Sequence, residues 1–283
     1  MKKIIKITSA LITSIAMNAF AVDTYNASNG QLTIPSVNVS GVIYNNVVVT
    51  VGNVLSVGTT STPNQSAEGL WTGTLSNGYV MNSLVLENNE YWNIIGSVIG
   101  GTFVVGALDN GGYITNGNVG TTYYREYYQT GPALLGYGLG VVTSGVSINE
   151  TIAVNGFNPV KVNLTPIESN SYNYNQSAKI NDIAGAWTGS FLSGLTGSIS
   201  VTSNGTFTGI ASSCIFSGVF TPRPSGKNVF NFSLYTSTGC GNSNGVTSTG
   251  VAITFITASG KRQLLAGGVD TTKTLGDMFF SLR

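Results

Sequence analysis

Residues 197–211 read Gly197-Ser198-Ile199-Ser200-Val201-Thr202-Ser203-Asn204-Gly205-Thr206-Phe207-Thr208-Gly209-Ile210-Ala211. In this stretch, an Asn-Gly dipeptide lies between two short runs rich in β-branched and aromatic residues. Asn-Gly adopts the positive φ angles of a two-residue type I′ turn readily, so this stretch predicts a β-hairpin. Asn-Gly occurs seven times along the chain, beginning at Asn29, Asn77, Asn110, Asn116, Asn155, Asn204 and Asn244. The sequence therefore predicts an all-β, antiparallel fold.

A second motif divides the chain into two related units. Gly69-Leu70-Trp71-Thr72-Gly73 returns as Gly185-Ala186-Trp187-Thr188-Gly189, and we interpret the pair as the first strands of β units at 67–178 and 179–283. In the first unit we expect strands at 71–75, 81–86, 91–98, 102–108, 113–115, 139–143 and 146–154. In the second unit we expect strands at 187–191, 197–202, 207–211, 214–220, 229–235, 250–257, 263–269 and 279–282.

So many short strands are typical of a small closed barrel or a sandwich. Closure removes unpaired strand edges, which favour aggregation in a chain with only 8% charged residues. We expect Trp71 and Trp187 to fill the bottoms of their barrels; the alternative is that they line an open cavity for a ligand. Replacing a buried tryptophan by alanine would then lower stability by about 3 to 5 kcal/mol.

The first 21 residues have the pattern of a secretory signal peptide. A basic start at 1–6 precedes an apolar stretch at 7–17 and the cleavage motif Ala19-Phe20-Ala21. The apolar stretch is shorter than the ~20 residues that span a membrane, so we expect residues 1–21 to be removed during export. No cysteine closely follows the cleavage motif, so we expect no stable lipid anchor.

Residues 22–60 are expected to form a small N-terminal β module, and residues 61–66 a linker. Apolar and polar positions alternate within the module, with apolar residues at Leu32, Ile34, Val37, Val39, Val42 and Tyr44. The segment 56–66 is polar and has no such periodicity.

Composition excludes several classes of function. The 283 residues include no histidine, so every His-based catalytic or metal-binding motif is absent. Twelve cationic and eleven acidic residues give a net charge of +1, and removal of three leader lysines gives 9 − 11 = −2. So little positive charge argues against nucleic acid and anionic lipid as partners. We expect no catalytic, cofactor-binding or metal-binding residues, and hence no enzyme.

Cys214 and Cys240 are the only cysteines, and an exported chain favours their pairing in a disulfide. The alternative is two buried free thiols. A catalytic thiol lacks a histidine to activate it.

Two acidic residues flank a possible hairpin tip at Asn88-Asn89. Glu87 and Glu90 would face each other across a tight hairpin, as in a cation site or in the carboxylate pair of a retaining glycosidase. A hairpin tip is normally solvated, however, and nothing in the sequence raises the pKa of either carboxyl group. We expect a solvated tip.

The most unusual local composition is Tyr123-Tyr124-Arg125-Glu126-Tyr127-Tyr128. Exposed tyrosines provide large rigid surfaces, so Tyr123, Tyr124, Arg125, Tyr127 and Tyr128 are candidates for binding a protein or glycan partner. Alternatively, half of these rings fill the core. Whether the segment is a strand or a helical turn stays open.

Two further segments have structural explanations. Gly136-Tyr137-Gly138-Leu139-Gly140 superficially matches a dinucleotide fingerprint, but no helix pattern follows it, so we interpret its glycines as barrel packing. Arg223 and Lys227 lie on a turn stiffened by two prolines, and turn rigidity explains the segment. Contact of the two cations with an acidic partner is the alternative.

Several segments resemble known exported proteins. Residues 32–37 with 46–52 resemble a short β module at the start of many exported proteobacterial proteins, and Gly-x-Trp resembles the opening of lipocalin-type barrels. Residues 86–92, 214–218, 221–231 and 262–270 resemble segments of an uncharacterised family of exported, often lipoprotein-borne Gram-negative β-barrel proteins. That family is similar in architecture to transferrin-binding-type surface lipoprotein barrels. The chain departs from its lipoprotein members because it lacks the acylated cysteine.

The resemblance implies a lipocalin-like fold and a periplasmic, cell-surface or secreted location, and it supplies no catalytic residues. It also implies that Arg283 covers a tryptophan. We therefore predict an exported, non-enzymatic protein that binds a protein or small-molecule ligand. The alternatives are an outer-membrane or structural β-barrel, although many strands are shorter than a membrane strand, and a carbohydrate-active enzyme using Glu87 and Glu90.

Overall fold

The computed structural model describes residues 24–26, 31–39, 42–50, 66–99, 102–114, 118–167 and 172–283. The expected signal peptide lies outside these ranges, as does the expected linker except for Ser66. The chain divides into two compact units, Met1–Pro63 and Asn64–Arg283. The first unit holds an antiparallel sheet of β1 (Thr24–Asn26), β2 (Gln31–Val39) and β3 (Val42–Thr50), in that order.

The second unit contains two closed barrels, each an up-and-down meander of eight antiparallel strands. The first barrel consists of β4 (Gly69–Leu75), β5 (Val80–Val85), β6 (Glu90–Ile99), β7 (Thr102–Ile114), β8 (Asn118–Tyr127), β9 (Leu134–Thr143), β10 (Ser147–Val154) and β11 (Val160–Pro166). Pairing of β11 with β4 closes it. The prediction of an all-β antiparallel fold with two related β units is confirmed, and each of these β units is a closed barrel.

The second barrel follows a single helical turn, α1 (Ile180–Ile183). Its strands are β12 (Gly185–Phe191), β13 (Thr196–Val201), β14 (Thr206–Ala211), β15 (Cys214–Pro222), β16 (Phe230–Thr236), β17 (Thr247–Ile256), β18 (Arg262–Asp270) and β19 (Gly276–Leu282). A 3₁₀ turn, η2 (Gly241–Ser243), lies between β16 and β17. Pairing of β12 with β19 closes this barrel. All eight strands predicted for the second β unit are present in it.

The hairpin turns differ from the predicted type I′ geometry. At Asn77-Gly78 and Asn204-Gly205 only the glycine has a positive φ, 90° for Gly78 and 89° for Gly205. The amide of Gly205 donates to the carbonyl of Thr202, and the amide of Thr202 donates to that of Thr206. This arrangement is a three-residue hairpin loop with glycine in the left-handed position. The type I′ prediction was therefore wrong at these two positions, although both hairpins are present. Asn110-Gly111 lies within strand β7, so no hairpin forms there, and Asn29-Gly30 and Asn116-Gly117 lie outside the described residues.

Each tryptophan of the repeated motif fills the base of its barrel. Trp71 is 2% exposed and Trp187 is 1% exposed. Both indoles donate to a carbonyl four residues earlier, at 2.7 Å in each case: Trp71 to Ala67 and Trp187 to Ile183. The guanidinium carbon of Arg283 lies 3.8 Å from the centre of the Trp187 ring, a cation–π contact. The expected burial of both rings is confirmed, and Arg283 covers Trp187.

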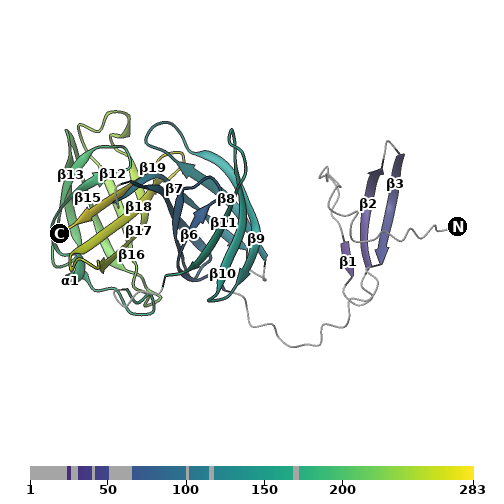
Figure 1. Ribbon diagram of the computed structural model, residues 1–283. Coiled ribbons are helices and arrows are strands. Elements are labelled where there is room, and N and C mark those ends of the chain that lie inside the picture. The colour runs from purple at the N-terminus through teal and green to yellow at the C-terminus, as the bar shows by residue number, and fades with distance from the viewer. Residues whose placement is uncertain are drawn as a thin grey trace. The chain divides into compact units, whose positions relative to one another are not determined.

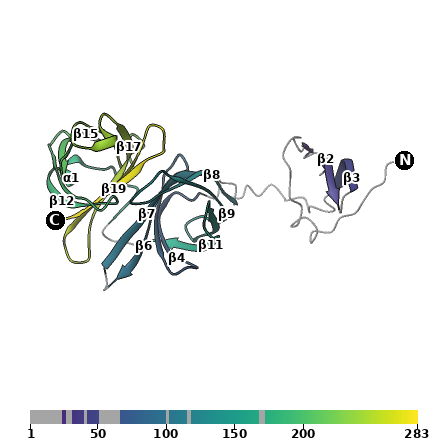
Figure 2. The same ribbon diagram turned by 90° about the horizontal axis from the view of Figure 1, so that it is seen from above.

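The barrels lie side by side and share an apolar interface (Figures 1 and 2). Outward-facing residues of β5 to β8 meet outward-facing residues of β17 to β19, and the segment between the barrels adds two tyrosines. The buried members are Leu84, Leu86, Trp92, Leu108, Tyr127, Tyr172, Tyr174, Leu192, Val229, Val251, Ile253, Val269 and Met278. These strands of both barrels are therefore buried on two faces, one inside the barrel and one at the interface.

Candidate functional site

A cavity of about 520 Å³ lies in the interior of the second barrel. Its wall is dominated by six aromatic rings, Phe191, Phe207, Phe216, Phe220, Phe232 and Phe279. They lie on alternate, inward-facing positions of their strands, and several contact one another, with 4.6 Å between the ring centres of Phe207 and Phe220. The base is closed by Trp187, so the cavity occupies the opposite half of the barrel.

Small residues beside these rings make the space. Gly209 lies in direct register with Phe216. A Cβ atom on Gly209 would lie 2.3 Å from Cε2 of Phe216, so the ring folds over the glycine rather than across the barrel. Ala211 and Ala266 also line the cavity. A barrel with larger residues at these positions would be filled by its own side chains.

The open end is formed by the turns that follow β12, β14, β16 and β18. The predicted disulfide between Cys214 and Cys240 is confirmed, with an S–S distance of 1.97 Å, and both residues line the cavity. It ties the start of β15 to the loop between β16 and β17, beside a hydrogen bond of 2.9 Å from Ser213 Oγ to the Gly239 carbonyl. The bridge therefore holds one side of the opening in place.

The first barrel completes the opening on another side. Its loop Tyr128, Gln129, Thr130 and Gly131 lines the cavity. Gln129 Nε2 donates to the Ser193 carbonyl at 3.4 Å, and the amide of Ala133 donates to the Thr274 carbonyl at 2.8 Å. Both barrels thus contribute to one site.

Two carboxyl groups line the cavity, and both accept hydrogen bonds from nearby donors. Asp277 Oδ1 accepts from the amides of Met278 at 2.8 Å and Ser193 at 3.2 Å, and Oδ2 accepts from Ser193 Oγ at 3.0 Å. Burial raises the pKa of Asp277, and these hydrogen bonds only partly oppose it. Asp270 is partly desolvated, but hydrogen bonds led by the one from Thr272 lower its pKa below the ordinary value.

Beside its apolar core, the interior of the first barrel contains a row of buried polar residues. Ser83, Asn93, Asp109 and Glu126 are direct cross-strand neighbours on β5 to β8, and all are buried. Tyr124 Oη lies 2.7 Å from Asp109 Oδ2 and 2.9 Å from Glu126 Oε2, so it bridges the two carboxyl groups. Burial, with repulsion from Glu126, raises the pKa of Asp109 well above its ordinary value. Burial therefore favours the protonated form of Asp109.

The tyrosine segment predicted as a partner-binding patch forms the end of β8, and Tyr128 follows directly after it. Tyr124 is 1% exposed in the core of the first barrel, and Tyr127 is 2% exposed in the interface between barrels. Tyr128 and Arg125 are half-buried, and the side chain of Tyr123 lies outside the described residues. The two most buried rings follow the core interpretation, so they do not form an exposed patch. Partner binding by this segment stays a prediction.

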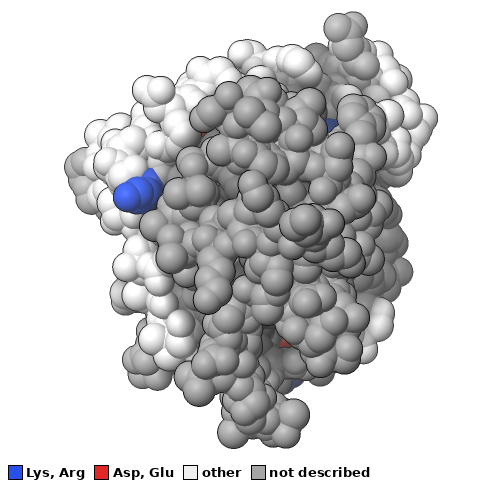
Figure 3. Space-filling model, turned by 90° about the vertical axis from the view of Figure 1, so that its right-hand side faces the viewer, with Lys and Arg blue, Asp and Glu red and all other residues white. Residues whose placement is uncertain are grey.

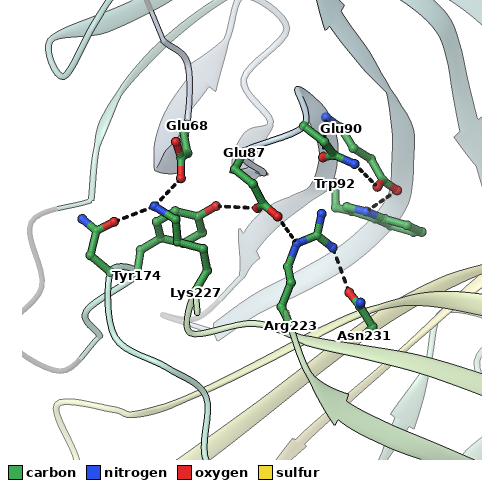
Figure 4. Close-up of polar contacts among 10 residues, drawn as sticks. Glu68, Glu87, Glu90, Trp92, Tyr174, Arg223, Lys227 and Asn231 are labelled. Atoms are coloured by element: carbon green, nitrogen blue, oxygen red, sulfur yellow. Dashed lines mark hydrogen bonds and ion pairs between the residues drawn. The ribbon is translucent and has the colours of Figure 1, made fainter. Parts of the chain in front are cut away.

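The acidic hairpin tip contacts the second barrel instead of forming a carboxylate pair (Figure 4). Glu87 Oε1 pairs with Arg223 Nε at 2.8 Å, and Glu90 Oε1 accepts from the Trp92 indole at 3.0 Å. Lys227 Nζ pairs with Glu68 at 2.5 Å. Glu87 and Asn88 remain exposed, in agreement with the expectation of a solvated tip, but Glu87 also forms an ion pair that the sequence did not predict. The acidic partner of Arg223 and Lys227 is the first barrel of the same chain.

The remaining sequence features have structural roles. The glycines of 136–140 lie in β9, as the barrel-packing interpretation predicted; a Cβ on Gly140 would lie 2.6 Å from Cα of Glu150.

Figure 3 shows few charged side chains among the described residues on one face, in keeping with the 8% charged composition. Within the described ranges, no helix has the length and apolarity needed to span a membrane.

Comparison with known proteins identifies no family. No protein-family model matches the chain, and no curated protein matches it. Among solved structures, the chain is similar to a protein of unknown function from the DUF3598 family of Nostoc punctiforme. The two share 11% identity over 76% of this chain and 95% of that chain, with a TM-score of 0.24. This likeness is too distant to transfer any property.

Proposed function

We propose that this protein binds a small, largely apolar molecule in the cavity of its second barrel. One observation carries the proposal: a cavity of about 520 Å³ is walled by six phenylalanine rings. Ligand pockets are typically concave, mostly apolar and roughly 300 to 1,000 Å³ in volume, with a few polar groups that fix orientation. The closed meander with a tryptophan at its base covered by Arg283 supports a lipocalin-like role.

Titration with N-phenyl-1-naphthylamine, an uncharged apolar dye whose fluorescence rises in apolar surroundings, tests this proposal. The wild-type protein should saturate at a stoichiometry of one dye per chain. Ala211→Trp places an indole inside the cavity and should reduce affinity at least about tenfold, since tenfold equals about 1.4 kcal/mol. Ser200→Trp adds the same indole at an exposed position on β13 and should leave binding unchanged.

Two results would overturn the proposal. The first is no saturable binding by a wild-type protein that shows a cooperative melt. The second is equal loss of binding in both tryptophan variants, which would place the dye outside the cavity.

We further propose that the protein acts outside the cytoplasm and is not an enzyme. The leader pattern supports export, and the disulfide between Cys214 and Cys240 suits an oxidising compartment. The absence of histidine supports binding rather than hydrolysis. Mass spectrometry of protein from a fractionated Gram-negative host should show a chain lacking residues 1–21 in the periplasm or medium. An intact chain in the cytosol would contradict export.

A further inference from the structure

One row of cross-strand neighbours in the second barrel brings an aromatic ring toward a carboxyl group. Phe232 is in direct register with Gly250, Gly250 with Gly268, and Gly268 with Asp277. Asp277 lies two residues before Phe279 on β19, so both side chains point into the barrel. Two glycines therefore separate Phe232 from Asp277 on the inner wall.

The glycines make room for the ring of Phe232 on this part of the wall. A Cβ on Gly268 would lie 2.6 Å from Cζ of Phe232, so the ring of Phe232 extends across β17 and rests against Gly268, the neighbour of Asp277. Any larger residue at position 268 would displace this ring. The arrangement places the aromatic surface and the carboxyl group within one corner of the cavity.

The carboxyl group of Asp277 is held in a fixed orientation. Oδ1 accepts two hydrogen bonds from backbone amides, whereas Oδ2 accepts one, from Ser193 Oγ. Asp277 also lines the cavity, so its carboxyl group lies within reach of a ligand bound there.

The charged side chains in the cavity wall are all acidic. Among the described residues that line the cavity, Asp270 and Asp277 are acidic, and none is lysine or arginine. An anionic head group would therefore meet carboxyl groups without a compensating cation, which is unfavourable in a desolvated site. A cation would be attracted both by the carboxylates and by the negative faces of the aromatic rings.

We infer that the ligand of this cavity is an amphiphilic amine, with an apolar body among the phenylalanine rings and its cationic nitrogen between Asp277 and Phe232. The inference rests on the proposed function, because it specifies the chemical class of the molecule bound there.

Three probes with the same chain length test this inference: dodecylamine, 1-dodecanol and dodecanoate. Each is added below its micellar concentration at pH 7.4, and its binding is measured by displacement of N-phenyl-1-naphthylamine. Dodecylamine should bind about tenfold or more tightly than dodecanoate, with dodecanol between them. Equal or tighter binding of dodecanoate would overturn the amine preference and leave apolar binding in place. Failure of dodecylamine to displace dye that itself binds would also overturn the amine inference, whereas failure of the dye to bind would overturn the proposed function.

Substitutions locate the head group. Asp277→Asn keeps the oxygen that accepts from the two amides. It should weaken the binding of dodecylamine about tenfold and change the affinity for dodecanol less than about twofold. Phe232→Leu keeps an apolar side chain but removes the aromatic face. It should also weaken the binding of dodecylamine more than the binding of dodecanol. Asp182→Asn, on α1 and paired with Arg262 at 3.4 Å, is the control that should change neither. Unchanged amine binding in both Asp277→Asn and Phe232→Leu would refute this placement.

Discussion

The two barrels share their strand order and begin with the same tryptophan motif, and each has an apolar core, yet one row of inward-facing residues differs in chemistry between them. In the first barrel, the row of cross-strand neighbours that begins at Trp71 continues through Ser83, Asn93, Asp109 and Glu126. In the second, the row that begins at Trp187 continues through Ile199, Gly209, Phe216 and Thr236. The alternation of inward and outward residues and the turns set the architecture, whereas the identities of a few inward-facing residues decide whether the interior holds a polar network or an apolar cavity.

The largest expected effect tests what the barrels have in common. Trp71→Ala and Trp187→Ala should each lower the free energy of unfolding by about 3 to 5 kcal/mol, because each removes a fully buried ring. Urea denaturation followed by circular dichroism measures the loss. Tyr79→Ala removes a ring that is 46% exposed and should cost far less. A loss below about 1 kcal/mol for either tryptophan would contradict its role as the base of a barrel.

The disulfide distinguishes the second barrel from the first, where the described residues contain no cysteine. Replacing both Cys214 and Cys240 by serine should lower stability by about 3 to 4 kcal/mol on the chain-entropy model, for a sequence separation of 26. The same denaturation experiment measures it, with reductant added to the wild type as a second route to the open form. Equal stability with and without the bridge would show that the barrel alone holds the opening.

The buried carboxyl group of the first barrel predicts a pH dependence. The folded pKa of Asp109 is raised above its ordinary value of 3.8, so the folded state binds more protons than the unfolded state between these two values. The contribution of Asp109 is therefore fully present below pH 3.8 and is lost as the pH rises through the folded pKa. Asp109→Asn should remove this dependence and raise stability at pH 7 by about 1 to 3 kcal/mol.

Thermal melts from pH 3 to 8 measure this effect, with Asp182→Asn as the control because Asp182 lies outside the first barrel. A variant less stable than wild type at pH 7 would show that the charged form of Asp109 is the one that the barrel stabilises.

How far the sequence predicts the strands depends on which faces are buried. All eight strands of the second barrel were predicted from alternating residues, with Asn-Gly dipeptides marking two of the turns, at Asn204 and Asn244. In the first barrel, 118–127 was missed because Tyr124 points into the barrel while Tyr127 points into the interface, and because the register of β8 shifts between Gly120 and Tyr124. Apolar and polar residues therefore do not alternate along β8. The missed strand β11 has a readable signal, since Val160, Val162 and Leu164 alternate with polar residues. The expected strands 102–108 and 113–115 are one strand, β7, with an irregularity between Asn110 and Gly112.

The cavity was not predictable from local pattern. It depends on Gly209 and Gly268 facing Phe216 and Phe232 from other strands, and on a loop of the first barrel at its opening. The cysteine pair gave the one sequence signal for the place of the opening. Glu87 and Arg223 are 136 residues apart, and only the packing of one barrel on the other brings them together.

The smallest expected effect concerns this contact between the barrels. The side chains of Arg223 and Glu87 are 10% and 28% exposed, and Arg223 Nη1 also donates to Asn231 Oδ1 at 2.8 Å. Burial opposes ionisation of Glu87, but the hydrogen bond and charge of Arg223 lower its pKa below 4.5. The contribution of Glu87 is therefore present above pH 4.5 and is lost as the pH falls through the folded value.

A double-mutant cycle with Glu87→Gln and Arg223→Gln should give a coupling free energy of about 0.2 to 1 kcal/mol at pH 7, decreasing with added salt. Both barrels should still unfold in one transition, because the apolar interface around Trp92, Leu108 and Val251 remains intact. Lys227→Gln, which breaks the neighbouring pair with Glu68, is the matched comparison. Separate melting of the two barrels after loss of one ion pair would mean that charge, rather than the shared apolar surface, couples the acidic barrel to the one with the cavity.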